Sequence, residues 1–290
     1  SKLADQNTIL LPRGETMCDD LTNASNDEFL AKSGGISRRR FGQLAAGGSL
    51  VAALPSVANA MDVAEDDVMV PMAEGVSDCY FVRPVTGKHA AIVLWPDIMS
   101  IRPAFRQMGK RLAQSGYSVL VVNPYYRTFA GRITPEGGTF ADEAVRNLLF
   151  PQAGTLSPET CVSDGRDYVA WLDQQDSVST SRKIGSAGYC MTGSYVMRMA
   201  ADMPDRIGAG ASFHGGGLVS DDASSPHLLA DQINAGLLIA IAVNDDESQP
   251  GAKDALASAF GDKAEVEVYQ AQHGWCPLDS HVYDLSLIHI

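Results

Sequence analysis

One cysteine of this chain stands where a thiol could act as a nucleophile. Cys190 follows the short apolar segment 184–189 and precedes a segment with the apolar spacing of an amphipathic helix. A sharp turn between a strand and a helix lifts a nucleophile above a sheet, and the helix N-terminus stabilises a thiolate or an oxyanion. Gly188 permits close approach of the two elements, although Thr192 stands where the strict motif has glycine. A buried cysteine that only fills space is the alternative, and the turn favours the nucleophile.

Such a thiol needs a base and a third group that orients the base, because it is only slightly ionised at neutral pH. His273 follows the last predicted strand, and Asp245 follows the strand before it. With Cys190 they have the chain order of an α/β-hydrolase triad. Asp246 remains an alternative acid, but we favour Asp245 because it lies nearer the strand end, where its position is better fixed. His214 precedes the acid in the chain and is predicted to form a wall of the substrate pocket.

Two backbone N–H groups would stabilise an oxyanion at this site. One belongs to Met191, directly after the nucleophile, and the other to Ile98, in the loop after the strand that ends at Trp95. A thiolate leaves a tetrahedral intermediate more readily than an alkoxide does, so activated esters such as enol lactones should be favoured over alkyl esters. Peptides are disfavoured too, unless His273 protonates the departing amine.

The elements that must position these residues alternate between strands and helices from about residue 61. Strands are expected over 79–82, 90–95, 117–122, 183–188, 207–213, 237–243 and 264–269, and helices over 104–114, 141–149, 158–174, 251–260 and after Cys190. Apolar strands separated by helices predict an α/β fold with a mostly parallel sheet and helices on both faces. Ligands and catalytic groups gather beyond the carboxyl ends of such strands. Six polar or reactive residues follow strands here: Asp97, Arg127, Cys190, His214, Asp245 and His273.

Composition limits the function classes. The chain has 290 residues, of which 45% are hydrophobic, which suits one large domain. A formal charge of −13 and a pI near 4.8 disfavour nucleic acid and anionic membrane surfaces as partners. The five cysteines form no CxxC pair and no zinc-ligand spacing with histidine, so no metal site is expected.

The first sixty residues have the features of an export signal. Arginines at 38–40 precede Phe41 and an uncharged Gly- and Ala-rich stretch that ends in small residues at Ala60. Charged, apolar and small-residue regions in this order are similar to a twin-arginine signal, with cleavage after Ala60. The apolar stretch is too short for stable membrane insertion. We therefore expect two regions, an N-terminal extension with the signal over 1–60 and a hydrolase domain over 61–290, and a periplasmic product.

Several motifs together resemble the dienelactone hydrolase family. They are WPDIMSIRPAFR at 95–106, NPYYR at 123–127, GYCM at 188–191, ND at 244–245 and HGW at 273–275. The resemblance spans about residues 75–283. It implies an α/β-hydrolase fold without a large lid domain, a Cys-Asp-His triad of Cys190, Asp245 and His273, no cofactor, and hydrolysis of an enol lactone.

The resemblance also assigns roles at positions where this chain departs from the family. The family's acidic residue that governs thiol ionisation, usually glutamate, falls on Asp97, whose side chain is one methylene shorter. Of two arginines that bind a substrate carboxylate, Arg127 matches one, and the other, shortly after the catalytic histidine, has no counterpart. We expect the family's C-terminal helix to be missing here, through truncation or a non-native tail at 284–290. Residues 1–16 precede Met17, which is compatible with a natural start, so these residues are expected to be extraneous.

The sequence therefore predicts a monomeric, periplasmic, cysteine-dependent hydrolase of small-molecule esters or lactones that acts through an acyl-thioester. The departures at Asp97 and Thr192 and the missing second arginine motivate an alternative, a non-catalytic binder of a small acidic ligand in the same cleft. A redox role that pairs Cys190 with Cys276 is a third reading.

Overall fold

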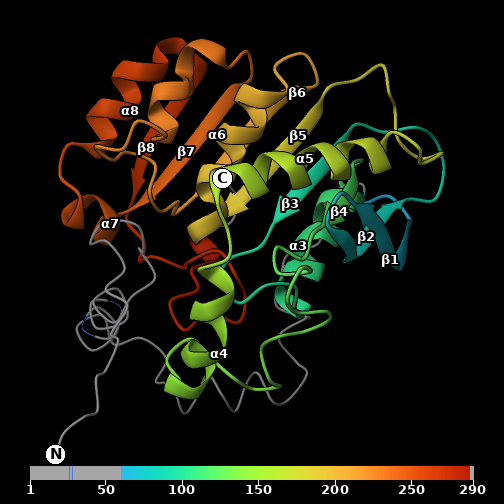
Figure 1. Cartoon of the computed structure of the whole chain (residues 1–290), viewed down its shortest axis with the longest axis horizontal. Coiled ribbons are helices and arrows are strands. Elements are labelled where there is room, and N and C mark those ends of the chain that lie inside the picture. Colours follow the sequence, from blue (N-terminus) through green and yellow to red (C-terminus); the bar gives the residue numbers. More distant parts are fainter. Residues whose placement is uncertain (1–25, 27, 29–59, 288–290) are drawn as a thin grey trace, which may run out of the picture.

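The computed structural model describes residues 26, 28 and 60–287. Its centre is an eight-stranded sheet with the order β1-β2-β4-β3-β5-β6-β7-β8 (Figure 1). The strands are β1 (Val63–Met72), β2 (Gly75–Pro84), β3 (Ala91–Trp95), β4 (Ser118–Val121), β5 (Ile184–Tyr189), β6 (Ile207–Phe213), β7 (Gly236–Ala242) and β8 (Ala264–Tyr269). The β1-β2 and β2-β4 pairs are antiparallel and all other pairs are parallel.

Helices cover both faces of this sheet. They are α3 (Pro103–Gln114), α4 (Glu143–Ala153), α5 (Pro158–Leu172), α6 (Gly193–Asp202), α7 (Val243–Ser248) and α8 (Ala252–Phe260), and short turns of 3-10 helix include η2 (Cys190–Thr192), η3 (Pro226–Gln232), η4 (Gly261–Lys263) and η5 (Leu285–Leu287). Buried side chains of α5, α6 and α8 pack on one face, and those of α3 pack on the other. The predicted α/β fold with a mostly parallel sheet is therefore confirmed, and no large lid domain interrupts residues 60–287.

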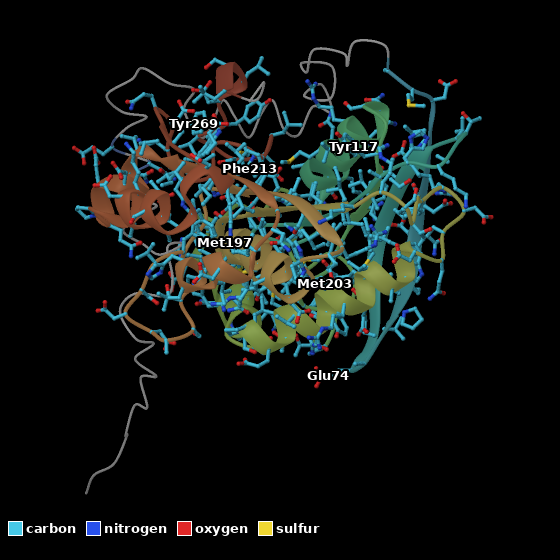
Figure 2. All side chains as sticks on the ribbon, turned by 90° about the horizontal axis from the view of Figure 1, so that it is seen from above. Glu74, Tyr117, Met197, Met203, Phe213 and Tyr269 are labelled. Carbon is cyan, nitrogen blue, oxygen red and sulfur yellow. The ribbon has the colours of Figure 1, made fainter. Side chains whose placement is uncertain are left out.

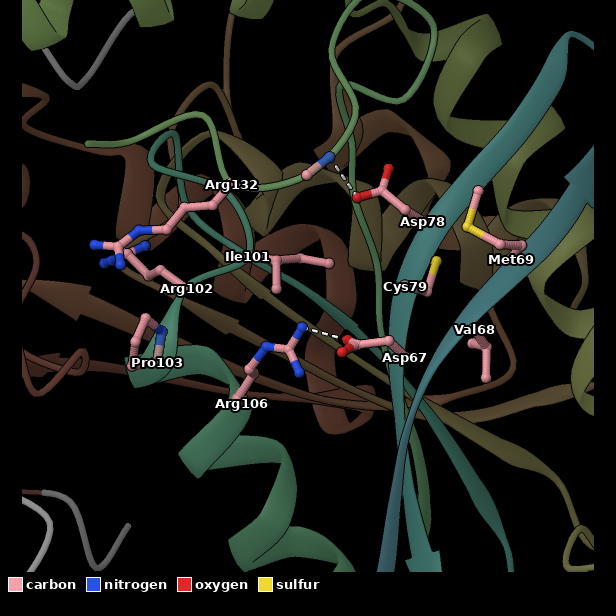
Figure 3. A pocket seen from close by; sticks show the side chains of 11 residues that line it. Asp67, Val68, Met69, Asp78, Cys79, Ile101, Arg102, Pro103, Arg106 and Arg132 are labelled. Atoms are coloured by element: carbon pink, nitrogen blue, oxygen red, sulfur yellow. Dashed lines mark hydrogen bonds and ion pairs between the residues drawn. The ribbon is translucent and has the colours of Figure 1, made fainter. Parts of the chain in front are cut away.

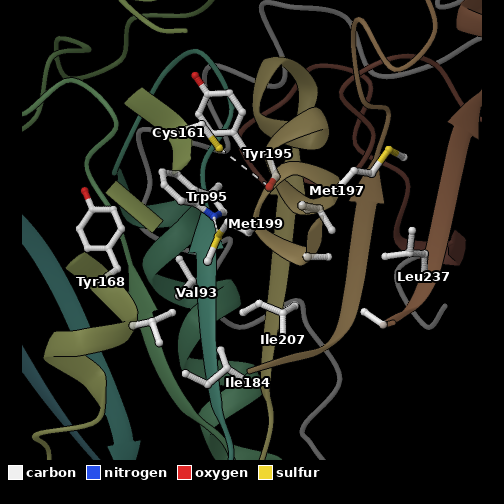
Figure 4. Packing of buried hydrophobic residues seen from close by; sticks show 14 of the residues in the cluster. Val93, Trp95, Cys161, Tyr168, Ile184, Tyr195, Met197, Met199, Ile207 and Leu237 are labelled. Carbon is white, nitrogen blue, oxygen red and sulfur yellow. Dashed lines mark hydrogen bonds between the residues drawn. The ribbon is translucent and has the colours of Figure 1, made fainter. Parts of the chain in front are cut away.

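The larger core lies between the sheet and helices α5 and α6 (Figure 4). Trp95 is fully buried there, with the rings of Tyr168 and Tyr195 packed edge-on at 5.4 and 5.3 Å. Its indole N–H points at the sulfur of Met199, 3.0 Å away. Because Trp95 ends β3, this packing fixes the start of the loop that carries Asp97 and Ile98.

The observed elements match most of the predicted ranges. β6 and β8 have the predicted bounds, and the other predicted strands and helices differ by a few residues. The sequence missed β1, because Glu65, Asp66 and Asp67 interrupt any apolar pattern on this edge strand. It also missed the short helix α7, which begins at Val243, where the strand was expected to end.

Most of the predicted export signal lies outside the described residues. Of residues 1–60, the structure describes Asn26, Glu28 and Ala60 alone. At the other end, residues 270–287 contain loops and η5, with no α-helix among them. Among the described helices, none has both the length and the apolarity needed to cross a membrane.

Candidate active site

The turn at Cys190 has the backbone of a strained nucleophile turn. Cys190 joins β5 to η2 and α6, and its φ of 57° lies in the left-handed region, which is rare for residues other than glycine. Strain of this kind persists only where the surrounding packing enforces it. The geometry agrees with the prediction that the side chain stands above the carboxyl end of the sheet.

Two glycines make this turn sterically feasible. A Cβ atom on Gly188 would lie 2.3 Å from the carbonyl oxygen of Thr192, and one on Gly193 would lie 2.5 Å from the Cα of Gly215. Real Cβ atoms do not approach so closely. The close approach that the strict motif assigns to the second residue after the nucleophile is therefore made here by Gly193, one residue later.

Replacing Gly188 by alanine is expected to destabilise the fold and to abolish activity. The clash is with backbone atoms, which cannot move aside as a flexible side chain would. We therefore expect the free energy of unfolding to fall by about 3 kcal/mol, the upper end of the usual cost of overpacking a core. Urea denaturation would measure this loss. Gly236→Ala is the matched control, because a Cβ there meets nothing within 4 Å. Equal stability of the two variants would contradict the steric account.

Thr192 ties the nucleophile turn to the loop after β3. Its side chain is fully buried, and its Oγ1 accepts a hydrogen bond from the Tyr189 N–H at 3.0 Å. The single hydroxyl proton can reach the carbonyl oxygen of Pro96 at 2.9 Å or that of Trp95 at 3.0 Å. The hydroxyl thus bridges the turn before Met191 and the loop that leads to Ile98, the two predicted sources of oxyanion N–H groups. From the sequence, Thr192 is recognisable only as a departure from the motif.

Thr192→Val should lower kcat while leaving KM nearly unchanged. The valine keeps the shape but leaves the buried Tyr189 N–H without its acceptor, which costs about 1–3 kcal/mol. If this cost raises the free energy of the transition state relative to the bound substrate, kcat decreases roughly tenfold to hundredfold. Steady-state kinetics on Thr192→Val and Thr192→Ser would test this, because serine keeps the hydroxyl. A serine variant as slow as the valine variant would refute the bridging role.

Asp245 holds the imidazole of His273. The Nδ1 atom of His273 lies 3.0 and 2.9 Å from the two carboxylate oxygens of Asp245, and both side chains are buried. Asp245 lies in α7, directly after β7, and His273 follows β8. An ionised carboxylate accepts at this distance, so the Nδ1–H donates and Nε2 is left as the basic nitrogen. Of the two candidate acids, Asp245 is thus the one that contacts His273.

Asn244 fixes the backbone of the same histidine. Its side-chain oxygen accepts from the His273 N–H at 2.8 Å. The carbonyl of His273 accepts from Asn26 at 3.0 Å, and the two asparagine side chains lie 3.4 Å apart. Neither Asn244 nor Asn26 was predicted to have a role at the site. The only signal for Asn244 was its place beside Asp245 in a motif, and Asn26 is too distant in sequence to give one.

His214 forms a buried wall beside the candidate base. Its ring lies edge-on to that of His273, with 4.7 Å between ring centroids, and neither ring nitrogen has a hydrogen-bond partner in the described part of the chain. Burial, and then the neighbouring His273, hold the pKa of His214 well below its usual range. The ring is therefore neutral at pH 7, which suits a pocket wall. The Gly216 N–H donates to the Cys190 carbonyl at 3.0 Å and so joins this loop to the nucleophile turn.

The other described cysteines are unsuited to nucleophilic catalysis. Cys79, Cys161 and Cys276 are free and buried. Burial raises the pKa of Cys79 to about 12, and it raises the pKa values of Cys161 and Cys276 well above the ordinary value. These three thiols therefore stay protonated at neutral pH.

The sulfur of Cys190 itself is in a disulfide in this structure. The thiol that a nucleophile requires forms only when this bond is reduced. Cys276 is a free cysteine and is not the partner. The bridge between Cys190 and Cys276 that the redox reading requires is therefore not formed.

Asp97, predicted to govern thiol ionisation, and Arg127, predicted to bind substrate, both lie in ion pairs. The Asp97 carboxylate accepts from the Nη1 and Nη2 atoms of Arg102 at 2.6 and 2.9 Å, and Arg102 also binds Asp279. Arg127 binds both oxygens of Asp164 and also Glu74. Arg102 was not predicted to be the partner of Asp97, although both lie in the same family-like motif.

A separate pocket of about 460 Å³ lies between the β1-β2 edge and the start of α3 (Figure 3). Its lining includes Arg106, which pairs with Asp67, and Asp78, which accepts from the Gly131 N–H. None of the predicted site residues lines it. Within residues 26, 28 and 60–287, no group of three His, Cys, Asp or Glu side chains could hold a metal ion.

Comparison with known proteins agrees with this architecture. Residues 77–286 match the model of the dienelactone hydrolase family. A carboxymethylenebutenolidase of Rhodococcus opacus is 26% identical over 124 residues, which cover 43% of this chain and 43% of that protein. The match thus spans less than half the length of that relative.

Solved structures show the same fold. A structure classed as a dienelactone hydrolase from Klebsiella pneumoniae has a TM-score of 0.62 at 19% identity, covering 74% of this chain and 88% of that one. A dienelactone hydrolase from Anabaena variabilis has a TM-score of 0.57 at 16% identity, covering 78% and 93%. With the family match over most of the chain, these findings confirm the resemblance seen in the sequence: the chain belongs to the dienelactone hydrolase family.

Proposed function

We propose that this protein is a carboxylic ester hydrolase that cleaves activated esters or enol lactones through an acyl-thioester on Cys190. The observation that carries the proposal is the Asp245–His273 pair, placed at the same sheet edge as the strained turn of Cys190. Family membership supports ester or lactone hydrolysis. Neither the family match nor the relatives favour the alternative of a non-catalytic binding protein.

The proposed reaction begins with proton transfer from the Cys190 thiol to Nε2 of His273. The thiolate attacks the ester carbonyl, and the N–H groups of Met191 and Ile98 stabilise the oxyanion. Met191 lies in the first turn of η2, where N–H groups have no acceptor within the helix. Collapse of the tetrahedral intermediate expels the enolate or aryloxide, which takes the proton from His273 and leaves an acyl-thioester on Cys190. His273 then activates a water molecule, which hydrolyses the thioester.

A panel of esters tests this function. Under reducing conditions we expect hydrolysis of aryl esters and enol lactones at rates well above those of ethyl esters with the same acyl group. The reason is that the tetrahedral intermediate of an ethyl ester expels the Cys190 thiolate more readily than the ethoxide and so returns to substrate. An aryloxide or enolate leaves readily enough to compete with the thiolate. Ethyl esters cleaved as fast as aryl esters, or no turnover of any ester, would contradict the proposal.

We also propose that residues 37–60 direct export of a folded, monomeric enzyme to the periplasm. The support is the order of the charged, apolar and small-residue regions in the sequence. Exchanging Arg38 and Arg39 for lysine should leave the precursor in the cytoplasm, whereas the parent chain should yield a product that begins at Met61. Fractionation with N-terminal mass analysis would show either outcome.

A further inference from the structure

Arg102 is a buried cation that joins two loops of the candidate active site. It immediately precedes α3, and its side chain is 2% exposed. Its Nη1 and Nη2 atoms donate to the two oxygens of Asp97 at 2.6 and 2.9 Å, and its Nε and Nη2 atoms donate to those of Asp279 at 2.7 and 3.0 Å. Burial opposes the charge, but the carboxylates of Asp279 and Asp97 more than offset this and raise the pKa of Arg102 above its usual value. The charged guanidinium is therefore held in two forked ion pairs at once.

The first of these pairs fixes the turn after β3. The Ser100 N–H donates to the Asp97 carbonyl at 2.9 Å, and the Met99 N–H donates at 2.9 Å to the same carboxylate oxygen that Nη1 of Arg102 binds. Arg102 also reaches the Ser100 carbonyl at 3.3 Å. Ser100 is fully buried with a φ of 60°, a conformation that persists only where the surroundings enforce it. Arg102 is part of those surroundings.

This turn carries the Ile98 N–H, one of the two predicted oxyanion donors. Ile98 packs in one buried cluster with Cys190, and its N–H donates to no acceptor within residues 26, 28 and 60–287. An oxyanion donor has to be aimed in advance, because its contribution depends on geometry. Thr192 holds only the beginning of the loop, at Trp95 and Pro96. The direction of the Ile98 N–H therefore depends on the contacts that hold the turn beyond Pro96.

The second ion pair ties the turn to the loop that carries the candidate base. Asp279 and His273 lie in the loop after β8, which is an edge strand with β5, β6 and β7 between it and β3. Figure 2 shows Tyr269, the last residue of β8, well away from Glu74 in the turn between β1 and β2. The loop after β8 thus reaches back toward β3, and the contact of Arg102 with Asp279 joins residues 177 positions apart in the chain.

We infer that Arg102 is a positioning residue, which fixes the Ile98 N–H relative to His273 by anchoring the turn after β3 to the loop after β8. The inference rests on the proposed function, in which this N–H stabilises the oxyanion. His273 has anchors of its own in Asp245 and Asn244. Loss of the bridge should therefore loosen the turn and leave the base in place.

Two reactions of Cys190 separate the turn from the base. Acylation by a 4-nitrophenyl ester needs both the base and the oxyanion donors, whereas alkylation by iodoacetamide forms no oxyanion and needs the base alone. The full chain would be reduced and freed of reductant before each reaction, and peptide mapping would assign the products to Cys190. Nitrophenolate release at saturating ester gives the rate constant of acylation.

Asp279→Ala breaks the bridge with the least risk to the fold. The Asp279 side chain is 35% exposed, and its removal leaves the pair of Arg102 with Asp97 in place. We expect the acylation rate constant to fall about tenfold, less than the roughly 10²–10³-fold loss caused by removing an oxyanion donor outright. KM should change little, and alkylation of Cys190 should stay within about twofold of the parent rate.

Arg102→Lys tests the bridge from its other side. Lysine keeps the positive charge between the two carboxylates, but an ammonium cannot make two forked pairs. Acylation should fall by roughly tenfold to hundredfold, with alkylation again near the parent rate. Arg106→Gln is the matched control, because Arg106 lies in α3 and pairs with exposed Asp67. Both of its rates should stay near those of the parent.

The possible failures are distinguishable. Parental acylation in both Asp279→Ala and Arg102→Lys overturns the inference. A loss of acylation and alkylation by the same factor also overturns it, because the bridge would then support the base or the whole fold rather than the turn. If Cys190 of the parent chain is alkylated but never acylated, the proposed function fails, and the inference fails with it.

Discussion

Asp245→Asn is expected to lower kcat by about 10⁴-fold, as loss of the orienting carboxylate does in comparable triads. The carboxylate accepts from Nδ1 of His273 at 2.9 Å and so leaves Nε2 free to take the thiol proton. Asparagine keeps the size, but its amide can donate to Nδ1 and so favour the wrong tautomer. Steady-state kinetics with an aryl ester under reducing conditions would measure the effect.

Asp246→Asn is the matched control for this variant. Asp246 is the neighbouring carboxylate, in the same helix α7, and it carries the same formal charge. Its activity should stay within about twofold of the parent, since surface substitutions have small effects. If the two variants lose activity equally, the loss reflects net charge or the integrity of α7, and the proposed role of Asp245 is wrong.

Cys190→Ala is expected to remove hydrolysis almost completely, with a loss of at least roughly 10⁴-fold in kcat, because no other group can form the covalent intermediate. The other described thiols cannot replace it, since burial keeps Cys79, Cys161 and Cys276 protonated. The comparison must be made under reducing conditions, because the Cys190 sulfur is in a disulfide in this structure.

Cys161→Ala gives the corresponding control. It removes a buried thiol from α5 on the larger core and leaves the sheet edge unchanged. We expect a modest loss of stability from the small cavity and nearly parental kcat. If Cys190→Ala keeps parental activity under the same conditions, the thioester mechanism is excluded.

The fold was largely predictable because its central strands are near-continuous apolar segments. The central segment 207–213 gives a strand with the expected bounds, and so does 264–269 at an edge of the sheet, where apolar residues alternate with exposed glutamates. The edge strand β1 was not predictable in the same way, because three consecutive exposed acidic residues, Glu65, Asp66 and Asp67, interrupt its apolar pattern. Its pairing with β2 depends on register, which is a tertiary property.

The candidate site was predictable in its residue types and less so in its contacts. Chain order was enough to nominate Cys190, Asp245 and His273, because parallel strands deliver their carboxyl ends to one edge. It could not show that Thr192 bridges two loops or that Arg102 binds Asp97 and Asp279. Such contacts join residues distant in sequence, and their geometry follows from packing.

Mass spectrometry of the intact protein tests the central claim most directly. The reduced chain would be mixed with a slowly deacylating aryl ester, quenched in acid and analysed, with peptide mapping of any adduct. The account predicts a mass increase equal to one acyl group, carried by the peptide that contains Cys190. Turnover of the same ester with no acyl adduct, or with the adduct on another residue, would contradict it.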